Sequence, residues 1–354
     1  MGRSAFGKIR HGSLEILKMD SLFSRIEGTL QKHRMISPGE RILVACSGGA
    51  DSAALFHLLR ELALKRKIRL ALVHFDHGLR KESAKDFRFV RELARQFGIP
   101  FYGGRAKRAL YQKEKHLSPE EKARELRYDF FFKTAKKTRI RKIALGHHQD
   151  DQAETVLMRI LQGTGLRGLQ GIRPVAQSKG VTYLRPLIEV TRAELREYLG
   201  ARRLPYREDG TNRSLRFLRN RVRHLLLPLL EREFNPKIRN LLVHLARTVS
   251  VELKGLEDWV GRHWKLFMES QRDGTLQLDR ELFLFLPEAL QFRILDQALH
   301  SLDRRSGLDF SSWEVLQAGF RKGRVRMTLP RNLDLSLTKK KLLVRVCLRP
   351  GSEK

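Results

Sequence analysis

The chain has 354 residues, 41% of them hydrophobic, and is therefore long enough to form two domains that each bury a core. Lys and Arg outnumber Asp and Glu by 71 to 39, and the resulting net charge of +32 favours nucleic acid as a partner. No apolar run approaches the roughly 20 residues of a transmembrane helix. Two distant cysteines, Cys46 and Cys347, exclude a disulfide framework and a cysteine-ligated zinc site, which fits the reducing cytoplasm.

Residues 1–18 are polar, and we expect them to be a dispensable, disordered leader. From Arg41 to about Arg203, apolar runs typical of strands alternate with segments typical of helices. Strands are predicted at 42–46, 69–73, 99–102 and 142–145. Helices are predicted to begin at Ser52, to cover 83–97, 118–138 and 150–162, and, after a glycine-rich loop at 163–171, to resume behind the capping residue Thr191. This order predicts an α/β fold with a parallel, doubly wound sheet whose ligand lies at the carboxyl ends of the strands.

Beyond Asn212 the pattern becomes mainly helical. Helices are predicted at 217–234 and 237–267, further short helices after Asp279, and late strands at 325–329 and 342–346. We place a domain boundary near 231–236, with a catalytic domain at 19–232 and a helical linker and smaller, mainly helical C-terminal domain at 237–350. A basic cluster in that second domain predicts a surface for a nucleic-acid backbone, the alternative being a solvated face. The cluster comprises Arg321, Lys322, Arg324, Arg326, Arg331, Lys339, Lys340 and Lys341.

The most informative segment joins the first predicted strand to its helix. It consists of Ser47, Gly48, Gly49, Ala50, Asp51 and Ser52. Two glycines let the backbone approach a ligand closely, and the helix N-terminus adds partial positive charge, so the turn suits phosphate. No Gly-Lys-Ser/Thr closes the loop, which excludes a Walker motif. The alternative is an ordinary Gly-Gly turn before a capped helix.

Polar residues also follow two other predicted strands. His74, Phe75 and Asp76 end the second strand, where a nucleotide base or phosphate could meet them, although a solvated loop would read the same way. The sequence GHHQDDQAET follows the fourth strand at 146–155, and its histidines and carboxylates suit either a metal site or helix capping. Adjacent aspartates in a helix point about 100° apart, so Asp150 and Asp151 cannot serve one ligand equally. Asp151 is the better functional candidate.

Taken together, these motifs resemble the tRNA(Ile)-lysidine synthetase family of the ATP pyrophosphatases, from about Met19 to Val346. The segments that carry the resemblance are SGGADS at 47–52, HFDHGLR at 74–80, ARELRY at 123–128, GHHQDDQAET at 146–155, GTGLRGLQGI at 163–172, RPLIEV at 185–190 and DGTNRSLRFLRNRVR at 209–223. The chain departs from the family at Asp76, where Asn is usual, which puts a hydrogen bond to a base edge in doubt.

The resemblance implies a reaction and a set of site residues. The family adenylates the C2 oxygen of the wobble cytidine in the CAU anticodon of isoleucine tRNA with ATP, and free lysine then displaces AMP. Implied partners and cofactors are this tRNA, L-lysine, ATP and Mg²⁺, and a homodimer is expected. Nucleotide binding falls to residues 47–52, His74 and Phe75, with Asp51 also the Mg²⁺ ligand, since a carboxylate beside pyrophosphate suits that ion. Catalytic roles fall to Asp51, Arg124, Asp151 and Arg219, and substrate binding to His147, Asp151, Asn212, Asn220 and Arg223.

Three other functions compete with this interpretation. A tRNA thiolation enzyme would need reactive cysteines, and Cys46 lies at the end of a predicted buried strand, where a small apolar residue packs. A glutamine-dependent synthetase would need an amidotransferase domain with a nucleophilic Cys. A basic RNA-binding protein with a vestigial nucleotide fold would release no pyrophosphate from ATP.

Overall fold

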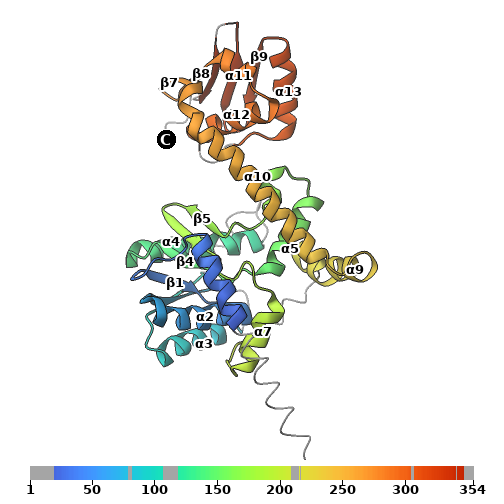
Figure 1. Ribbon diagram of the computed structural model, residues 1–354. Coiled ribbons are helices and arrows are strands. Elements are labelled where there is room, and N and C mark those ends of the chain that lie inside the picture. The colour runs from blue at the N-terminus through green and yellow to red at the C-terminus, as the bar shows by residue number, and fades with distance from the viewer. Residues whose placement is uncertain are drawn as a thin grey trace, which may run out of the picture. The chain divides into compact units, whose positions relative to one another are not determined.

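The computed structural model describes residues 20–78, 82–106, 119–208, 215, 217–303, 307–339 and 341–346. The chain forms two compact units, whose elements are labelled in Figure 1. Unit 1 takes the chain up to Leu161 and Gly171–His244, and unit 2 takes Gln162–Gln170 and the chain from Leu245 onward. The division into a catalytic and a C-terminal tRNA-binding domain stays a prediction. Among the described helices, none is both long and apolar enough to span a membrane.

Unit 1 is built on a six-stranded sheet with the order β3-β2-β1-β4-β6-β5. The strands are β1 (Arg41–Ala45), β2 (Arg69–Asp76), β3 (Phe101–Arg105), β4 (Lys142–Ala144), β5 (Val175–Ser178) and β6 (Val181–Leu184). All neighbours are parallel except β5 and β6, which form an antiparallel hairpin. The strand order reverses between β1 and β4, so the predicted doubly wound fold is confirmed and its switch point lies there.

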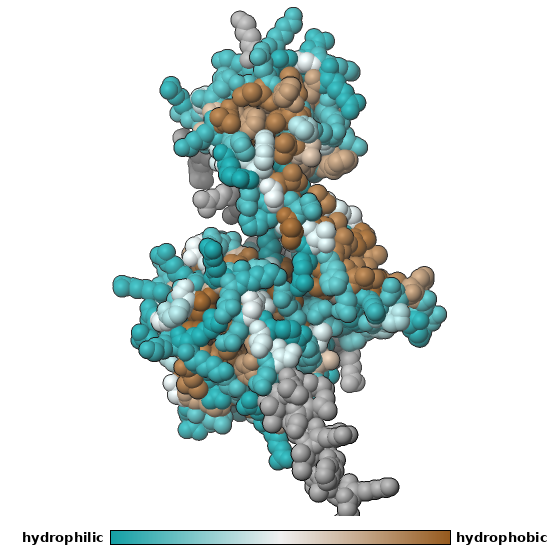
Figure 2. All heavy atoms as spheres, in the orientation of Figure 1, coloured by the Kyte–Doolittle hydropathy of each residue, from teal (hydrophilic) through white to brown (hydrophobic). Residues whose placement is uncertain are grey.

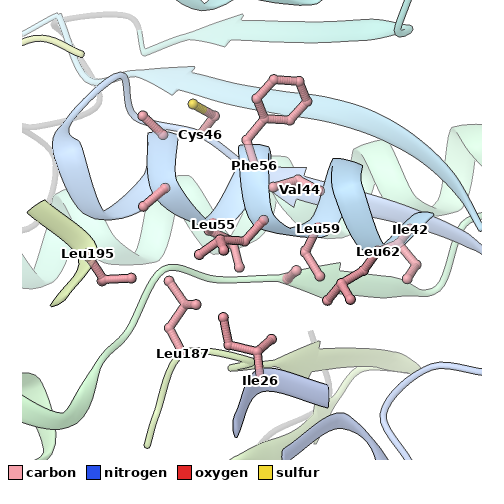
Figure 3. Close-up of a cluster of buried hydrophobic side chains, with 14 of the residues drawn as sticks. Ile26, Ile42, Val44, Cys46, Leu55, Phe56, Leu59, Leu62, Leu187 and Leu195 are labelled. Carbon is pink, nitrogen blue, oxygen red and sulfur yellow. The ribbon is translucent and has the colours of Figure 1, made fainter. Parts of the chain in front are cut away.

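Helices cover both faces of this sheet. They are a helix at 20–32, α2 (Ala50–Arg66), α3 (Ser83–Gln96), α4 (Pro119–Thr138), α5 (Gln149–Leu161) and α7 (Arg192–Ala201). Alternate residues of β1 serve the two faces: Ile42 and Val44 join one buried cluster, and Leu43 joins the other. Figure 3 shows α2 packing Leu55 and Leu59 into the first of these clusters. The loop between β1 and α2 is thus held at both ends by fully buried elements.

The segment after the sheet is less regular than the single helix predicted for 217–234. It consists of α8 (Leu218–Arg221), a π-helical turn η3 (Val222–Leu226) and α9 (Leu227–Glu233). The π turn is closed by the amide of Leu227, which donates to the carbonyl of Val222 five residues earlier. The long helix α10 (Ile238–Phe267) follows and continues from unit 1 into unit 2.

Unit 2 combines helices with a five-stranded antiparallel sheet of order β7-β8-β11-β10-β9. Its strands are β7 (Met268–Arg272), β8 (Thr275–Leu278), β9 (Val325–Leu329), β10 (Leu333–Leu337) and β11 (Leu342–Val346). Its helices are α6 (Leu166–Leu169), from the earlier segment, and, after α10, α11 (Arg280–Phe285), α12 (Glu288–Leu302) and α13 (Phe310–Arg321). The strands predicted at 325–329 and 342–346 are confirmed, whereas the sequence pattern missed β7, β8 and β10. Trp313 and Phe283 belong to a hydrophobic core of unit 2 that is separate from the two clusters of unit 1. Figure 2 shows mostly hydrophilic side chains on the visible surface.

Candidate functional site

The loop at 47–52 is shaped by its own side chains. The Ser52 hydroxyl donates to the carbonyl of Gly49 at 3.0 Å and accepts from the amide of Ser47 at 3.1 Å. Gly48 has φ +93°, a left-handed conformation that a side chain would strain. No side chain caps α2 at its N-cap residue Gly49. The first turn of α2 therefore keeps its amide donors for a ligand, and these donors together with the helix dipole favour an anion.

A cavity of about 430 Å³ opens on one side of this loop. Of the residues predicted to bind the nucleotide, Ser47, His74 and Phe75 line it. His74 is 4% exposed, and its Nδ1 lies 2.7 Å from the carbonyl oxygen of Cys46. Because that carbonyl can only accept, Nδ1 carries the hydrogen and Nε2, which has no described partner, is an acceptor. Burial lowers the pKa of His74, which keeps the ring neutral.

Asp76 has a local structural role at the rim of the same cavity. Its Oδ1 accepts from the amide of Gly78 at 2.7 Å, and its Oδ2 lies 3.2 Å from Arg105 Nε. The Asp76 side chain is almost completely buried. A carboxylate at this position therefore secures the turn after β2, where Gly78 has φ +65°.

A second cavity of about 530 Å³ lies against the same loop. It shares Ser47, Asp51, Ser52 and Asp86 with the first cavity. Its other lining residues are Gly49 and Ala50 and residues of α7 and of the chain after it, among them Arg192, Arg196 and Arg207. Both cavities lie in unit 1, at the carboxyl end of β1. This is the edge of the sheet at which the topological switch point predicts a ligand.

Asp51 stands between the cavities, on the first turn of α2. Its Oδ1 is buried without a hydrogen-bond partner, and its Oδ2 lies 3.4 Å from His148 Nε2. The described residues contain no group of three or more His, Cys, Asp or Glu side chains that could hold a metal ion. Mg²⁺ is commonly held by one or two carboxylates together with phosphates and water, so a carboxylate with one oxygen that has no hydrogen-bond partner among the described residues fits it beside this loop.

Asp151 lies at the centre of an ion-pair network on α5. It is 8% exposed, and its Oδ1 lies 2.8 Å from Arg219 Nη2 and 3.2 Å from Arg223 Nη2. Glu154, 1% exposed, binds the same two guanidinium groups, at 2.9 Å from Arg219 Nε and 2.5 Å from Arg223 Nε. Burial alone would raise the pKa of Asp151, but His148, Arg219, His147 and Arg223 together lower it. Asp151 is therefore an anion at neutral pH.

Glu154 was not among the predicted site residues. It follows Asp151 by three positions, so both carboxylates lie on one face of α5. That spacing was available in the sequence and could have identified Glu154 as the second acceptor for Arg219 and Arg223.

Asp150 points in a different direction from Asp151, as the helical geometry requires. Its Oδ2 accepts from the backbone amide of Arg192 at 2.8 Å, and its Oδ1 lies 3.6 Å from Arg239 Nη1. Asp150 thus caps the start of α7 and links it to α5, whereas Asp151 faces the arginines. The capping alternative applies to both aspartates, because Asp151 Oδ2 also accepts from the amide of His148, the residue before α5, at 3.1 Å.

The remaining predicted residues fall in different places. His147 lines the first cavity, where burial lowers its pKa to about 3. Arg124 is exposed and stacks over Tyr128 at 5.0 Å, while Arg127, one turn away, lines the cavity instead. Asn220 lies on α8 between Arg219 and Arg221, and Asn212 lies outside the described residues.

Cys46 is the cysteine that a thiolation reaction at this site would need to use. It is 2% exposed, and burial raises the pKa of its thiol, which therefore stays protonated at neutral pH. Its Sγ lies 3.8 Å from the Ser52 hydroxyl. Cys46 is thus a packing residue behind the loop, and Cys347 lies outside the described residues.

The sequence matches known proteins over most of its length. The PP-loop domain family matches residues 21–230. The tRNA(Ile)-lysidine synthase of Solibacter usitatus is 40% identical over 306 residues, covering 84% of this chain and 65% of that protein. The tRNA(Ile)-lysidine synthase of Clostridioides difficile is 32% identical over 316 residues, covering 88% of this chain and 68% of that protein. The chain thus spans about two thirds of the length of these relatives.

The fold also has a counterpart among solved structures. The U34-tRNA thiolase NcsA from Methanococcus maripaludis has a TM-score of 0.57 and 18% identity, covering 67% of this chain and 80% of that chain. At this identity the likeness shows the fold alone. The family match at 21–230 includes the loop at 47–52, Asp151 and both of its arginines. The chain therefore belongs to the PP-loop domain family and, within it, to the tRNA(Ile)-lysidine synthase family.

Proposed function

We propose that the protein uses ATP to join free L-lysine to C2 of the wobble cytidine in the CAU anticodon of isoleucine tRNA. The product is lysidine, which changes codon reading from AUG to AUA, and the by-products are AMP and pyrophosphate. The observation that carries the proposal is the buried, ionised Asp151 beside a phosphate-binding loop that has no Walker lysine. A cytoplasmic location and a homodimer are part of the same proposal.

The first step is adenylation. The C2 oxygen of the cytidine attacks the α-phosphorus of ATP, the bond to the bridging oxygen breaks, and pyrophosphate leaves. The first-turn amides of α2 stabilise the phosphate charge, and the first cavity receives the nucleoside. Asp51 would hold Mg²⁺, which would supply further neutralisation of the phosphates. Esterification to AMP turns a poor leaving oxygen into a good one.

The second step is attack by the lysine ε-amine on C2, whose bond to the esterified oxygen breaks as AMP leaves. An unperturbed lysine amine has a pKa near ~10.4, so the substrate arrives as an ammonium ion. The lowered pKa of Asp151 makes this carboxylate a good ion-pair partner but a weak base. Asp151 therefore positions the ammonium, and the proton passes on to water.

In this scheme Arg219 and Arg223 change partners. Both contact Asp151 and Glu154 in the structure, where no phosphate competes for them. The phosphate of the adenylated cytidine offers a guanidinium group a bidentate acceptor of equal charge. When Arg219 turns to that phosphate, Asp151 becomes available to the lysine ammonium.

The test is nucleoside mass analysis of isoleucine tRNA incubated with the protein, ATP, Mg²⁺ and lysine. We expect lysidine in place of the wobble cytidine, and AMP and pyrophosphate as the nucleotide products. Omitting lysine should leave pyrophosphate release dependent on tRNA while no lysidine forms. ADP as the main product, or thiolated nucleoside formed with a sulfur donor, would refute the proposal; the buried Cys46 thiol argues against the second outcome.

A further inference from the structure

A third cavity, of about 240 Å³, lies in unit 1, and none of its described lining residues belongs to the loop at 47–52. Arg127 and Phe131 of α4 line the first cavity, whereas Lys122 and Phe132 line the third, so the two cavities lie on different faces of this helix. We propose that the third cavity binds one unstacked nucleobase of a single-stranded RNA, with a preference for adenine and cytosine. This binding site does not depend on the reaction proposed above.

Three aromatic side chains line the third cavity. Tyr128 and Phe132 come from α4, and Tyr183 comes from β6. The ring centroids of Tyr128 and Tyr183 lie 5.0 Å apart in an edge-on arrangement, which holds both rings in place. Lys179 Nζ lies 5.8 Å from the centroid of Phe132, near the outer limit of a cation–π contact, so a base can displace it from that ring. Aromatic side chains are the surfaces on which proteins stack unpaired RNA bases.

The lining also carries hydrogen-bond donors and acceptors. Lys122, 9% exposed, contacts Glu125 Oε2 at 2.8 Å, and Lys133 contacts Asp129 Oδ2 at 2.7 Å. Each of these ion pairs uses one carboxylate oxygen, and the second oxygen can accept from an exocyclic amino group. Adenine and cytosine present such a group, whereas uracil does not. Because the lysine amines can donate to any base, the two carboxylates are the groups that select among bases.

A free ammonium ion is another ligand that aromatic rings and carboxylates can bind together. Here both carboxylates are already paired with lysines, and Lys179 adds a third positive charge to the lining. The cavity therefore has no excess negative charge to attract a cation. A nucleobase is uncharged and uses the same rings and polar groups without that requirement.

Exposed lysines continue from the cavity along α4. Lys133, Lys136 and Lys137 follow Asp129 at helical spacing, so all of them lie on the side of the helix that carries Asp129. Proteins bind single-stranded nucleic acid with this combination, in which basic side chains contact the phosphates and aromatic rings stack on the bases. The net charge of +32 for the whole chain favours the same ligand.

The test measures the binding of fluorescein-labelled RNA hexamers of adenosine, cytidine or uridine to the full chain by fluorescence anisotropy. Phe132→Leu keeps an apolar side chain but removes the ring, and the loss of one base stack should weaken the adenosine and cytidine hexamers about 5-fold or more. Glu125→Ala combined with Asp129→Ala should abolish the preference over uridine. This double variant should not weaken the uridine hexamer, because it loses only negative charge.

The matched control is Phe97→Leu. Phe97 also has a cation over its ring, with Arg60 Cζ 4.2 Å from the centroid, but it packs against the core of unit 1. Its hexamer affinities should equal those of the wild type, and thermal melts should show that all variants fold. A cytidine hexamer with one central iodocytidine locates the site, since illumination joins the iodinated base to a neighbouring aromatic ring. We expect the cross-link at Tyr128, Phe132 or Tyr183.

Several results would overturn the inference. They are cross-links confined to other parts of the chain, unchanged hexamer affinities in Phe132→Leu, and an equal loss of affinity in Phe97→Leu. A further one is weaker calorimetric binding of L-lysine by Phe132→Leu with hexamer binding intact, which would assign the cavity to a cationic ligand. If the hexamers bind as expected but no lysidine forms, the proposed function fails while this site stands.

Discussion

Two buried clusters of arginine and carboxylate, one in each unit, use the same chemistry for different ends. In unit 1, Arg219 and Arg223 share Asp151 and Glu154. In unit 2, Asp296 is 2% exposed, its Oδ2 forms an ion pair with Arg167 Nη1 at 2.7 Å, and its Oδ1 accepts from the amide of Leu308 at 3.1 Å. Asp296 also has Arg293 and His300 as neighbours on α12.

The clusters differ in what surrounds them. Arg223 of the first cluster lines the second cavity, and this cluster has one carboxylate for each of its two arginines. The cluster around Asp296 joins Arg167 of the segment 162–170 to α12, and Arg167 reaches Glu257 on α10 as well. The cluster in unit 1 is therefore a candidate site because it borders a cavity. In unit 2 the cluster secures a chain segment.

The largest expected effect is that of Asp151→Asn. The substitution preserves volume but removes the anion that should position the lysine ammonium, and losing such a group typically costs ~10²–10⁴-fold in rate. Lysidine formation should fall by that factor while ATP binding is retained. Rapid-quench assays with excess lysine would measure it.

Pyrophosphate release from ATP and tRNA provides the control for that variant, because adenylation precedes the lysine step. It should continue in Asp151→Asn. If Asp151→Asn formed lysidine at the wild-type rate with an unchanged thermal melt, Asp151 would be only a structural partner of Arg219. The cluster in unit 1 would then be structural, like the cluster in unit 2.

Asp296→Asn should affect stability rather than chemistry. It leaves Arg167 and Arg293 without their buried anion, and breaking a buried pair commonly costs about 3–5 kcal/mol. Urea unfolding should show unit 2 melting earlier, while ATP affinity in unit 1 stays at the wild-type value. A loss of ATP affinity equal to the loss in stability would show that the clusters are not separable.

His57 offers a third case, a buried titratable group with no hydrogen-bond partner among the described residues. It is 1% exposed on α2, neither ring nitrogen has a hydrogen-bond partner in the described part of the chain, and burial lowers its pKa to about 4. The unfolded chain takes up a proton below pH 6.5, but the folded chain does not until about pH 4. Stability should therefore be complete above pH 6.5 and fall by up to about 3 kcal/mol as the pH drops to 4.

His57→Leu should remove that part of the pH dependence, since leucine has similar volume and no proton to bind. Chemical unfolding of both chains between pH 4 and pH 7 would measure the difference. If the stability of both chains changed with pH in the same way, His57 would have a hydrogen-bond partner in solution, as the carboxylates of the two clusters have.

The smallest effect concerns the exposed basic cluster of unit 2. Lys339 and Lys341 are exposed near the turn between β10 and β11, and Lys340 lies outside the described residues. If both lysines contact tRNA phosphates, Lys339→Ala with Lys341→Ala should lower the log–log salt slope by roughly 0.7–0.9 per contact. Filter binding over a salt series would detect it, with ATP affinity as the control. An unchanged slope would identify the cluster as a solvated face.

Local sequence patterns predicted much of the fold because strand, helix and turn formation depends on interactions between residues close together in the chain. Apolar runs with a glycine turn fixed β1 and α2, and the late strands at 325–329 and 342–346 have the bounds expected of them. The missed hairpins turn at Lys179–Gly180 and Asp273–Gly274, where both residues have positive φ, so their turn signals were present but their strands are only four or five residues long.

The site was predicted less completely, because its contacts join distant segments. Arg219 and Asp151 are separated by 68 positions, and no periodicity encodes their pairing. Arg127 rather than Arg124 lines the first cavity, since the helix phase of α4 decides which of two arginines faces the sheet. Arg192 gave no motif at all. It lies 3.8 Å from Asp51 because α7 packs against α2.

The π turn at 222–226 has an evolutionary consequence. A π turn holds one residue more than an α turn, as a single insertion into an ordinary helix would leave it. Arg219 precedes this turn, Arg223 lies within it, and the fully buried Leu227 follows it. Because the turn absorbs its extra residue locally, deleting one residue of 222–226 would restore an ordinary α turn while Arg219 and Leu227 keep their relative orientation. A descendant of this gene could therefore lose one residue here at less structural cost than in a regular helix, where one deletion turns the two sides by about 100° relative to each other.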